Sequence, residues 1–167
     1  MIFTHTMDVS KPPAAVYAYV SDFKNLPRWD PTILRVDQTT PEPVGEGTRY
    51  LVVLSFLGSE TAMDYAVKEF QPPARAVLVG LAASAVATDT ITIEPTPTGS
   101  RLTWQAEIAL SWPARILDPV LKLLFSRDVT KAMANLAREL EALPQASTTN
   151  PLDPVLSEPI DGRPACV

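Results

Sequence analysis

The feature of this chain that most constrains its fold is a long amphipathic pattern, from about Pro113 to Leu143, that follows a strand-rich middle. Apolar residues recur along it at spacings of three and four, the periodicity of a helix with one buried face. A single long helix can bury such a stripe against strands only if the sheet curves around it. We therefore expect a cavity between a curved sheet and this helix. The residues of the stripe are Leu117, Leu121, Phe125, Val129, Met133, Leu136, Leu140 and Leu143.

The remainder of the chain favours strands. Residues Ile2–Val9 alternate, with Phe3, His5, Met7 and Val9 on one face, which is typical of a half-buried strand. No strand alternates with a helix along the chain, so a doubly wound parallel sheet is excluded. We predict an α+β fold in which a curved antiparallel sheet of seven strands wraps around the C-terminal helix and two short helices cap one end. The six further strands are expected at Thr32–Thr40, Thr48–Leu57, Glu60–Gln71, Ala74–Ala83, Ser84–Glu94 and Arg101–Ser111.

Two helix starts carry recognisable signals. Ser10 is an N-cap candidate for a short helix at Ala14–Val20, and the prolines at 12 and 13 suit its first turn. Asp118-Pro119 forms a similar pair inside the long helical pattern, which predicts a kink or a restart there.

The segment between the first helix and the second strand is rich in proline. Asp22 is placed to cap a second short turn that runs through Leu26. Pro27 and Pro31 then enclose residues 28–30, and we expect these three residues to be rigid, non-helical chain.

Composition excludes several classes of function. The hydrophobic content of 46% and charged content of 20% indicate a globular protein, and the net charge of -5 argues against nucleic acid or an anionic membrane as the main partner. We expect no membrane span, because no stretch of about 20 apolar residues occurs, and no secretory signal at the start. One cysteine rules out an intramolecular disulfide and fits a reducing compartment, so we expect a cytoplasmic protein.

The last part of the chain differs from the rest. Five of the 17 prolines fall within Pro144–Val167, which has few large apolar residues. We expect one domain over residues 1–143, able to fold alone, followed by an extended or disordered tail. The alternative is a strap across the sheet or an arm exchanged in a homodimer.

Several short segments resemble those of a known superfamily. They are Val9–Pro13 leading into Val16–Val20, then Asp22–Pro31, Gly45–Tyr50, Val67–Pro73 and Gly99–Thr103. With the order of elements, they resemble the START-like or helix-grip (SRPBCC) superfamily, and most of all its polyketide cyclase/dehydrase and lipid-transport branch. The resemblance covers about residues 1–143. It implies a ligand pocket rather than one reaction, since similar members include polyketide cyclases, ligand carriers, lipid-transfer domains and co-chaperone domains.

Three residues are candidates for acid–base chemistry. His5 shares the inward face of the first strand, where an imidazole would serve as acid or base for an enolisable ligand; the alternative is a histidine of the core or rim. Glu69 and Asp89 face inward if strand alternation holds, and a buried carboxylate with a raised pKa would act as a base. The alternatives are a solvated rim position for Glu69 and a hairpin cap for Asp89.

The expected cavity wall is mostly apolar and aromatic. Tyr50 and Tyr65 would each add a hydroxyl that orients a ligand, or would simply pack in the core. The predicted ligand-binding set is Trp29, Tyr50, Val52, Leu54, Tyr65, Trp104, Leu121 and Phe125.

We therefore expect the protein to bind a hydrophobic small molecule, aromatic or polyketide-like or lipid-like, in this cavity. The alternatives are a polyketide cyclase or dehydratase that uses the inward acid–base residues, and an interaction module whose interior is filled by side chains. One histidine and one cysteine argue against a multi-histidine or cysteine metal site, and no glycine loop for phosphate occurs, so we expect neither a metal nor a cofactor.

Overall fold

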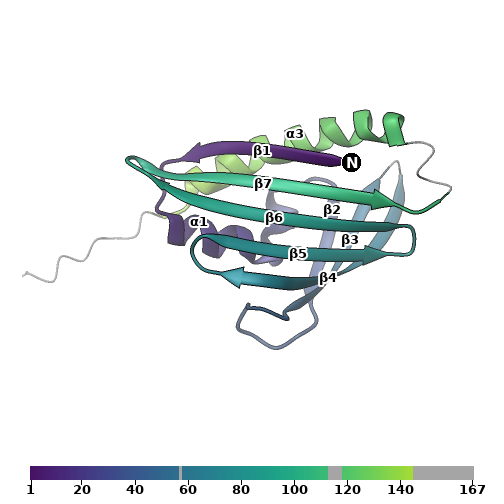
Figure 1. Ribbon diagram of the computed structural model, residues 1–167, viewed down its shortest axis with the longest axis horizontal. Helices are drawn as coiled ribbons and strands as arrows, with labels where there is room; N and C mark the ends of the chain where they lie inside the picture. Colours follow the sequence, from purple (N-terminus) through teal and green to yellow (C-terminus); the bar gives the residue numbers. More distant parts are fainter. Residues whose placement is uncertain (57, 113–117, 145–167) are drawn as a thin grey trace, which may run out of the picture.

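The computed structural model describes residues 1–56, 58–112 and 118–144, and Figure 1 shows their arrangement. In this part of the chain, seven strands form one sheet, and four helical segments lie along it. The strands are β1 (Ile2–Val9), β2 (Ile33–Gln38), β3 (Arg49–Phe56), β4 (Ser59–Gln71), β5 (Arg75–Ala82), β6 (Ala85–Thr96) and β7 (Gly99–Leu110). The helices are α1 (Pro13–Ser21), the 3-10 turn η1 (Phe23–Asn25), α2 (Leu26–Trp29) and α3 (Asp118–Ala142).

The sheet is antiparallel throughout, with the order β1-β7-β6-β5-β4-β3-β2. Strands that follow each other from β2 to β7 are neighbours, and β1 completes the sheet by pairing with β7. Figure 1 shows that β2 and β3 curl behind the other strands, toward the side that carries the helices. The predicted fold of a curved sheet around the long C-terminal helix is therefore confirmed.

Buried side chains and polar contacts attach the C-terminal half of helix α3 to the rest of the domain. Its buried side chains there are Ala132, Met133, Leu136 and Leu140. The ammonium of Lys11, only 5% exposed, donates to the carbonyl oxygen of Leu143 at 2.5 Å, which satisfies one of the carbonyls that a helix end leaves without a partner.

Ser10 does not cap α1 as expected. The N-cap of α1 is Pro12, which makes no side-chain cap bond. Instead the backbone N–H of Ser10 donates to Oε1 of Glu141 at 2.8 Å, and its hydroxyl contacts the other oxygen of that carboxylate. The reason is tertiary, because the end of α3 brings a stronger, charged acceptor to this serine.

The expectation of non-helical chain after Pro27 is wrong for Arg28 and Trp29, while Asp30 is extended as expected. Residues Leu26–Trp29 form α2, with the proline in the first turn, where its missing N–H leaves no helical hydrogen bond unmade. The side chain of Asn135 on α3 donates to the carbonyl oxygen of Trp29 at 2.9 Å and so joins the two helices. The predicted cap at Asp22 is confirmed, since its carboxylate accepts from the N–H of Lys24 at 3.0 Å.

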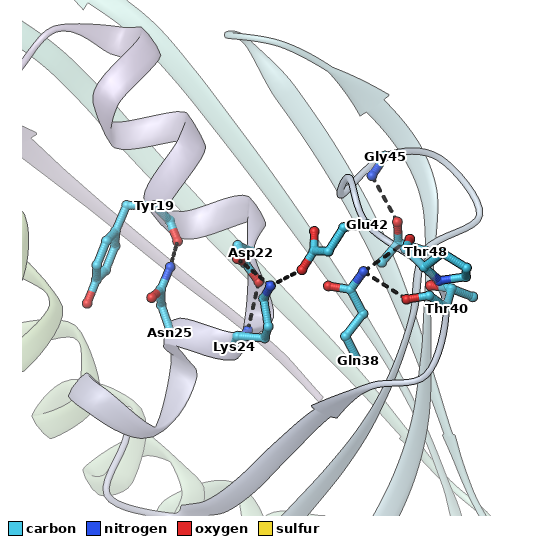
Figure 2. A network of polar contacts seen from close by, with 10 residues as sticks. Tyr19, Asp22, Lys24, Asn25, Gln38, Thr40, Glu42, Gly45 and Thr48 are labelled. Atoms are coloured by element: carbon cyan, nitrogen blue, oxygen red, sulfur yellow. Dashed lines mark hydrogen bonds and ion pairs between the residues drawn. The ribbon is translucent and has the colours of Figure 1, made fainter.

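Polar contacts attach the short helices to the loop between β2 and β3 (Figure 2). The ammonium of Lys24 contacts the carboxylate of Glu42 and lies 3.5 Å from that of Asp22. Asn25 donates to the carbonyl oxygen of Tyr19 at 2.9 Å, which secures the turn after α1. Exposed ion pairs of this kind contribute little stability each, so their effect is mainly to orient η1.

Two parts of the sequence predictions fall on residues that are not described. Helix α3 opens with the Asp118-Pro119 pair, and residues 113–117 of the longer predicted helix lie outside the described residues. The tail beyond residue 144 lies outside them as well. None of the helices within residues 1–56, 58–112 and 118–144 is both long enough and apolar enough to cross a membrane.

A glycine sets the position of one inward tyrosine. Tyr65 on β4 pairs with Gly80 on β5, and the tyrosine ring lies directly over the glycine. A Cβ atom at position 80 would lie 2.5 Å from the Cε2 and Cζ atoms of the ring. Position 80 must therefore lack a side chain for the ring to keep this place.

We expect Gly80→Ala to displace the ring of Tyr65 and to lower the free energy of unfolding by about 1–3 kcal/mol, because overpacking forces side chains out of their preferred positions. Chemical denaturation measures this change. Gly45→Ala is the matched control, since a Cβ there would meet nothing within 4 Å, and it should shift the free energy by no more than about 0.5 kcal/mol. Equal stabilities of the two variants would contradict the close contact between Gly80 and the ring of Tyr65.

Candidate functional site

A cavity of about 110 Å³ lies between the concave face of the sheet and helices α2 and α3. Its wall is largely apolar and aromatic, with a few polar groups, the usual composition of a small-molecule pocket. The lining residues are Phe3, His5, Phe23, Leu26, Trp29, Asp30, Ile33, Val52, Leu54, Tyr65, Asp89, Trp104, Ala106, Val129, Ala132 and Met133.

Two further pockets adjoin this cavity. One of about 150 Å³ and one of about 210 Å³ both have Leu54 and Tyr65 in their walls, as the first cavity does. Both are also lined by Ile108 and Phe125, which places them toward the start of α3. Apolar space therefore continues along the concave face from Trp29 toward Phe125.

Aromatic rings pack against one another in the wall of the cavity. The ring of Phe23 stacks on that of Trp104, with centroids 6.1 Å apart, and meets Tyr65 edge-on at 5.2 Å. Trp29 meets Trp104 edge-on at 5.2 Å. Such pairs add about 0.5–1.5 kcal/mol each beyond burial, so they stabilise this part of the wall.

The carboxyl group of Asp89 is the most deeply buried charge in the cavity. It lies on β6, where the indole Nε1–H of Trp104 donates to Oδ1 at 2.8 Å. Burial raises the pKa of Asp89 to about 6; the Trp104 hydrogen bond and the Tyr65 hydroxyl partly oppose this shift, and the nearby charge of Asp30 adds to it. A carboxyl with this pKa can both take up and release a proton near neutral pH.

Asp30 is a second carboxyl in the cavity wall, and it is not among the candidate residues predicted from the sequence. Its Oδ1 accepts from the N–H of Thr32 at 2.9 Å and from the Thr32 hydroxyl at 2.7 Å. Burial raises the pKa of Asp30, the two bonds from Thr32 lower it, and the charge of Asp128 on α3 raises it. The Asp-x-Thr spacing indicates a local turn, but no sequence signal turns this carboxyl toward the cavity.

The hydroxyl of Tyr65 completes the polar part of the wall. Burial raises the pKa of Tyr65 well above its usual value, and the charges of Asp89 and Asp30 raise it further. The phenol therefore stays protonated and serves as a hydrogen-bond donor next to Asp89.

His5 lies on the inward face of β1 and lines the cavity. It is half-buried and stands opposite Trp104 in the pairing of β1 with β7. The structure thus brings His5, Asp89 and Tyr65 to one cavity, while the catalytic roles of His5 and Asp89 stay predictions.

Glu69 does not belong to this group, and the expectation that it faces inward is wrong. The pairing of β4 with β5 shifts between Val67 and Glu69, which is a bulge that changes the alternation of the strand. The carboxylate of Glu69 instead pairs with the guanidinium of Arg75, with Nε–O distances of 3.1 and 3.2 Å. Glu69 is absent from the described wall of the cavity and of the pockets that adjoin it.

The predicted ligand-binding residues fall into three groups. Trp29, Val52, Leu54, Tyr65 and Trp104 line the main cavity, and Phe125 lines the two pockets that adjoin it. Tyr50 does not line the cavity, because it is 1% exposed and stacks on Phe23 at 5.8 Å, away from the open space. The side chain of Leu121 lies outside the described residues.

Comparison with known proteins agrees with this geometry. The family model described as polyketide cyclase / dehydrase and lipid transport matches residues 1–141. The chain belongs to this family. Uncharacterized proteins of Mycobacterium bovis and Mycobacterium tuberculosis are 29% identical to it over 149 residues, which cover 84% of this chain and 85% of each relative.

Solved structures of similar fold include two bacterial proteins. A START superfamily protein from Mycobacterium smegmatis superposes with a TM-score of 0.72 at 16% identity, covering 86% of this chain and 99% of that one. A protein from Thermus thermophilus has a TM-score of 0.71 at 16% identity, covering 84% and 97%. At these identities the likeness establishes the fold alone.

The raised pKa of Asp89 makes the stability of this family member depend on pH. Between about pH 4 and 6 the folded state holds a proton on Asp89 that the unfolded state has released, so the free energy of unfolding falls as pH rises through this window. Asp89→Asn keeps an acceptor for Trp104 but cannot ionise. We expect its stability relative to the wild type to increase from pH 4 to pH 7, by at most about 3 kcal/mol.

Urea denaturation across this pH range measures the difference. Asp64→Asn, on the exposed face of β4, is the matched control and should show no such trend. Parallel stability curves for the wild type and Asp89→Asn would show that Asp89 titrates as an ordinary exposed carboxyl.

Proposed function

We propose that this protein binds an apolar small molecule, with an aromatic ring system or a lipid-like chain, in the cavity between the sheet and α3. The observation that carries the proposal is the cavity itself, which is lined by packed aromatic rings. The family to which the chain belongs, described as polyketide cyclase / dehydrase and lipid transport, is consistent with a ligand pocket at this place.

Apolar burial would supply most of the affinity. The rings of Phe23 and Trp104 lie nearly parallel and Trp29 meets Trp104 edge-on, and ring surfaces of this kind suit a planar ring more than a flexible chain. Each 100 Å² of apolar ligand surface removed from water contributes about 2.5 kcal/mol before the costs of association are subtracted. The pockets near Phe125 give room for a ligand longer than one ring system.

A side chain that fills the cavity should abolish binding. Ala106 on β7 faces the cavity, and Ala109 on the same strand faces solvent, so Ala106→Phe and Ala109→Phe form a matched pair. We expect 2-naphthalenemethanol to raise the melting temperature of the wild type and of Ala109→Phe. For Ala106→Phe, titration calorimetry should show at least about tenfold weaker binding, because the phenyl ring occupies the site.

Equal affinity of the two variants would place the ligand elsewhere on the protein. Absence of any stabilisation by neutral ring compounds would contradict the proposed function.

A second candidate is acid–base catalysis on an enolisable ligand, as in a cyclase or dehydratase. The specific observation in its favour is that Asp89, with a pKa of about 6, lies beside the donor hydroxyl of Tyr65 in the same cavity. In such a step the carboxylate of Asp89 would take the proton from the carbon next to a carbonyl group. The Tyr65 hydroxyl would donate a hydrogen bond to the enolate oxygen that forms.

Proton exchange tests this candidate without knowledge of the natural substrate. An aromatic 1,3-diketone in deuterated buffer should exchange its α-protons faster with the wild type than with Asp89→Asn, as followed by nuclear magnetic resonance. A general base contributes about 10²–10⁴-fold in rate. Equal exchange rates with both proteins would leave ligand binding as the function.

A further inference from the structure

The charge of the cavity is not balanced by any cationic side chain in its described wall. Asp30 and Asp89 both line the cavity, and among the described residues that line it and the two adjoining pockets no lysine or arginine occurs. The other titratable groups that face these two carboxyls are His5 on β1, Tyr65 on β4 and Asp128 on α3. None of these brings a permanent positive charge.

The groups that bind the two carboxyls are neutral donors. Asp89 accepts from the indole of Trp104, and Asp30 accepts from the backbone N–H and the hydroxyl of Thr32. Hydrogen bonds from neutral groups orient a carboxylate but leave its net charge in place. Burial is the main cause of the raised pKa values of Asp89 and Tyr65, and the negative charge of Asp30 raises both further, as expected for negative charge without a cation at close range.

The same space has aromatic walls. Trp29, Trp104 and Phe23 stand around the cavity beside Asp30 and Asp89. The faces of such rings attract cations, most strongly where the contact is shielded from water. Aromatic rings next to carboxylates form a surface that matches an organic ammonium group attached to an apolar body.

We propose that this cavity selects, among apolar ligands, those that carry a protonated amine, which it holds against Asp89 and Asp30. The inference rests on the proposed function and names the class of ligand for the same site. The two carboxylates are already removed from water in the free protein, so an ammonium group gains their attraction without adding the cost of burying them. An anionic head group, such as a carboxylate, meets repulsion instead.

Three ligands with one ring system and different polar groups test this selectivity. The probes are 2-naphthylmethylamine, 2-naphthalenemethanol and 2-naphthoate, titrated calorimetrically into the full chain at pH 7.5. We expect the amine to bind at least about tenfold more tightly than the alcohol, and the naphthoate to bind more weakly than both.

Variants then show which groups recognise the amine. In Asp89→Asn and, independently, in Asp30→Asn, the ratio of the amine affinity to the alcohol affinity should fall by about tenfold or more. Asp64→Asn removes one negative charge from the exposed face of β4 and should leave the ratio unchanged. Because the readout is a ratio within one protein, a general change in stability does not alter it, and Asp30→Asn keeps the test valid if Asp89→Asn fails to fold.

The outcomes separate this inference from the proposed function. Binding of the alcohol with equal or weaker binding of the amine overturns the amine selectivity and supports the proposed function. A preference for the amine that persists in both Asp89→Asn and Asp30→Asn overturns the assignment to these carboxyls. Failure of all three probes to bind overturns both proposals.

Discussion

The rest of the structure depends on how α3 is attached to the sheet. Contacts at its C-terminal end, from Lys11 to the carbonyl of Leu143 and from Asn135 to the carbonyl of Trp29, fix the helix to the loop before α1 and to the end of α2. Side chains in that half, such as Leu136 and Leu140, are fully buried. Toward the middle of the helix, Val129 is only half-buried and lines a cavity. Beside this middle part of the helix, and toward Phe125, the curved sheet leaves the space that we propose as the site.

Polar groups inside that space lower the stability of the fold, so their presence there suggests a functional role. A carboxyl in an apolar wall is destabilising unless it is bonded, and Asp89 is bonded by Trp104 yet keeps a raised pKa. Gly80 lets the ring of Tyr65 lie flat on β5, with its hydroxyl near the same carboxyl. A purely structural core would be more stable with apolar residues at these positions. Their presence beside an open cavity is the main reason to expect recognition of a ligand's polar group, or chemistry on it.

Much of the architecture could be predicted because strands and helices leave periodic patterns. The alternation along β1 and β7 placed His5 and Trp104 on the inward face correctly, and the stripe of α3 predicted the side that packs on the sheet. The prediction for Glu69 failed at a single point, since the bulge after Val67 shifts the alternation and turns its carboxylate to Arg75. A bulge depends on how two strands pair, so the pattern of one strand does not reveal it.

The sequence by itself determined the class of fold, the long helix over the sheet and the apolar character of the cavity, because these follow from periodicity and composition that are local to each segment. Only the tertiary structure decided which polar groups meet inside. Asp30 follows a four-residue helix and Asp89 lies on a strand 59 positions later, yet both carboxyls face one cavity. Ser10 is a second example. It does not cap α1, because the tertiary structure brings the carboxylate of Glu141 to its backbone N–H. The pairing of distant strands and helices decides which side chains line the same cavity, and local sequence patterns do not reveal this pairing.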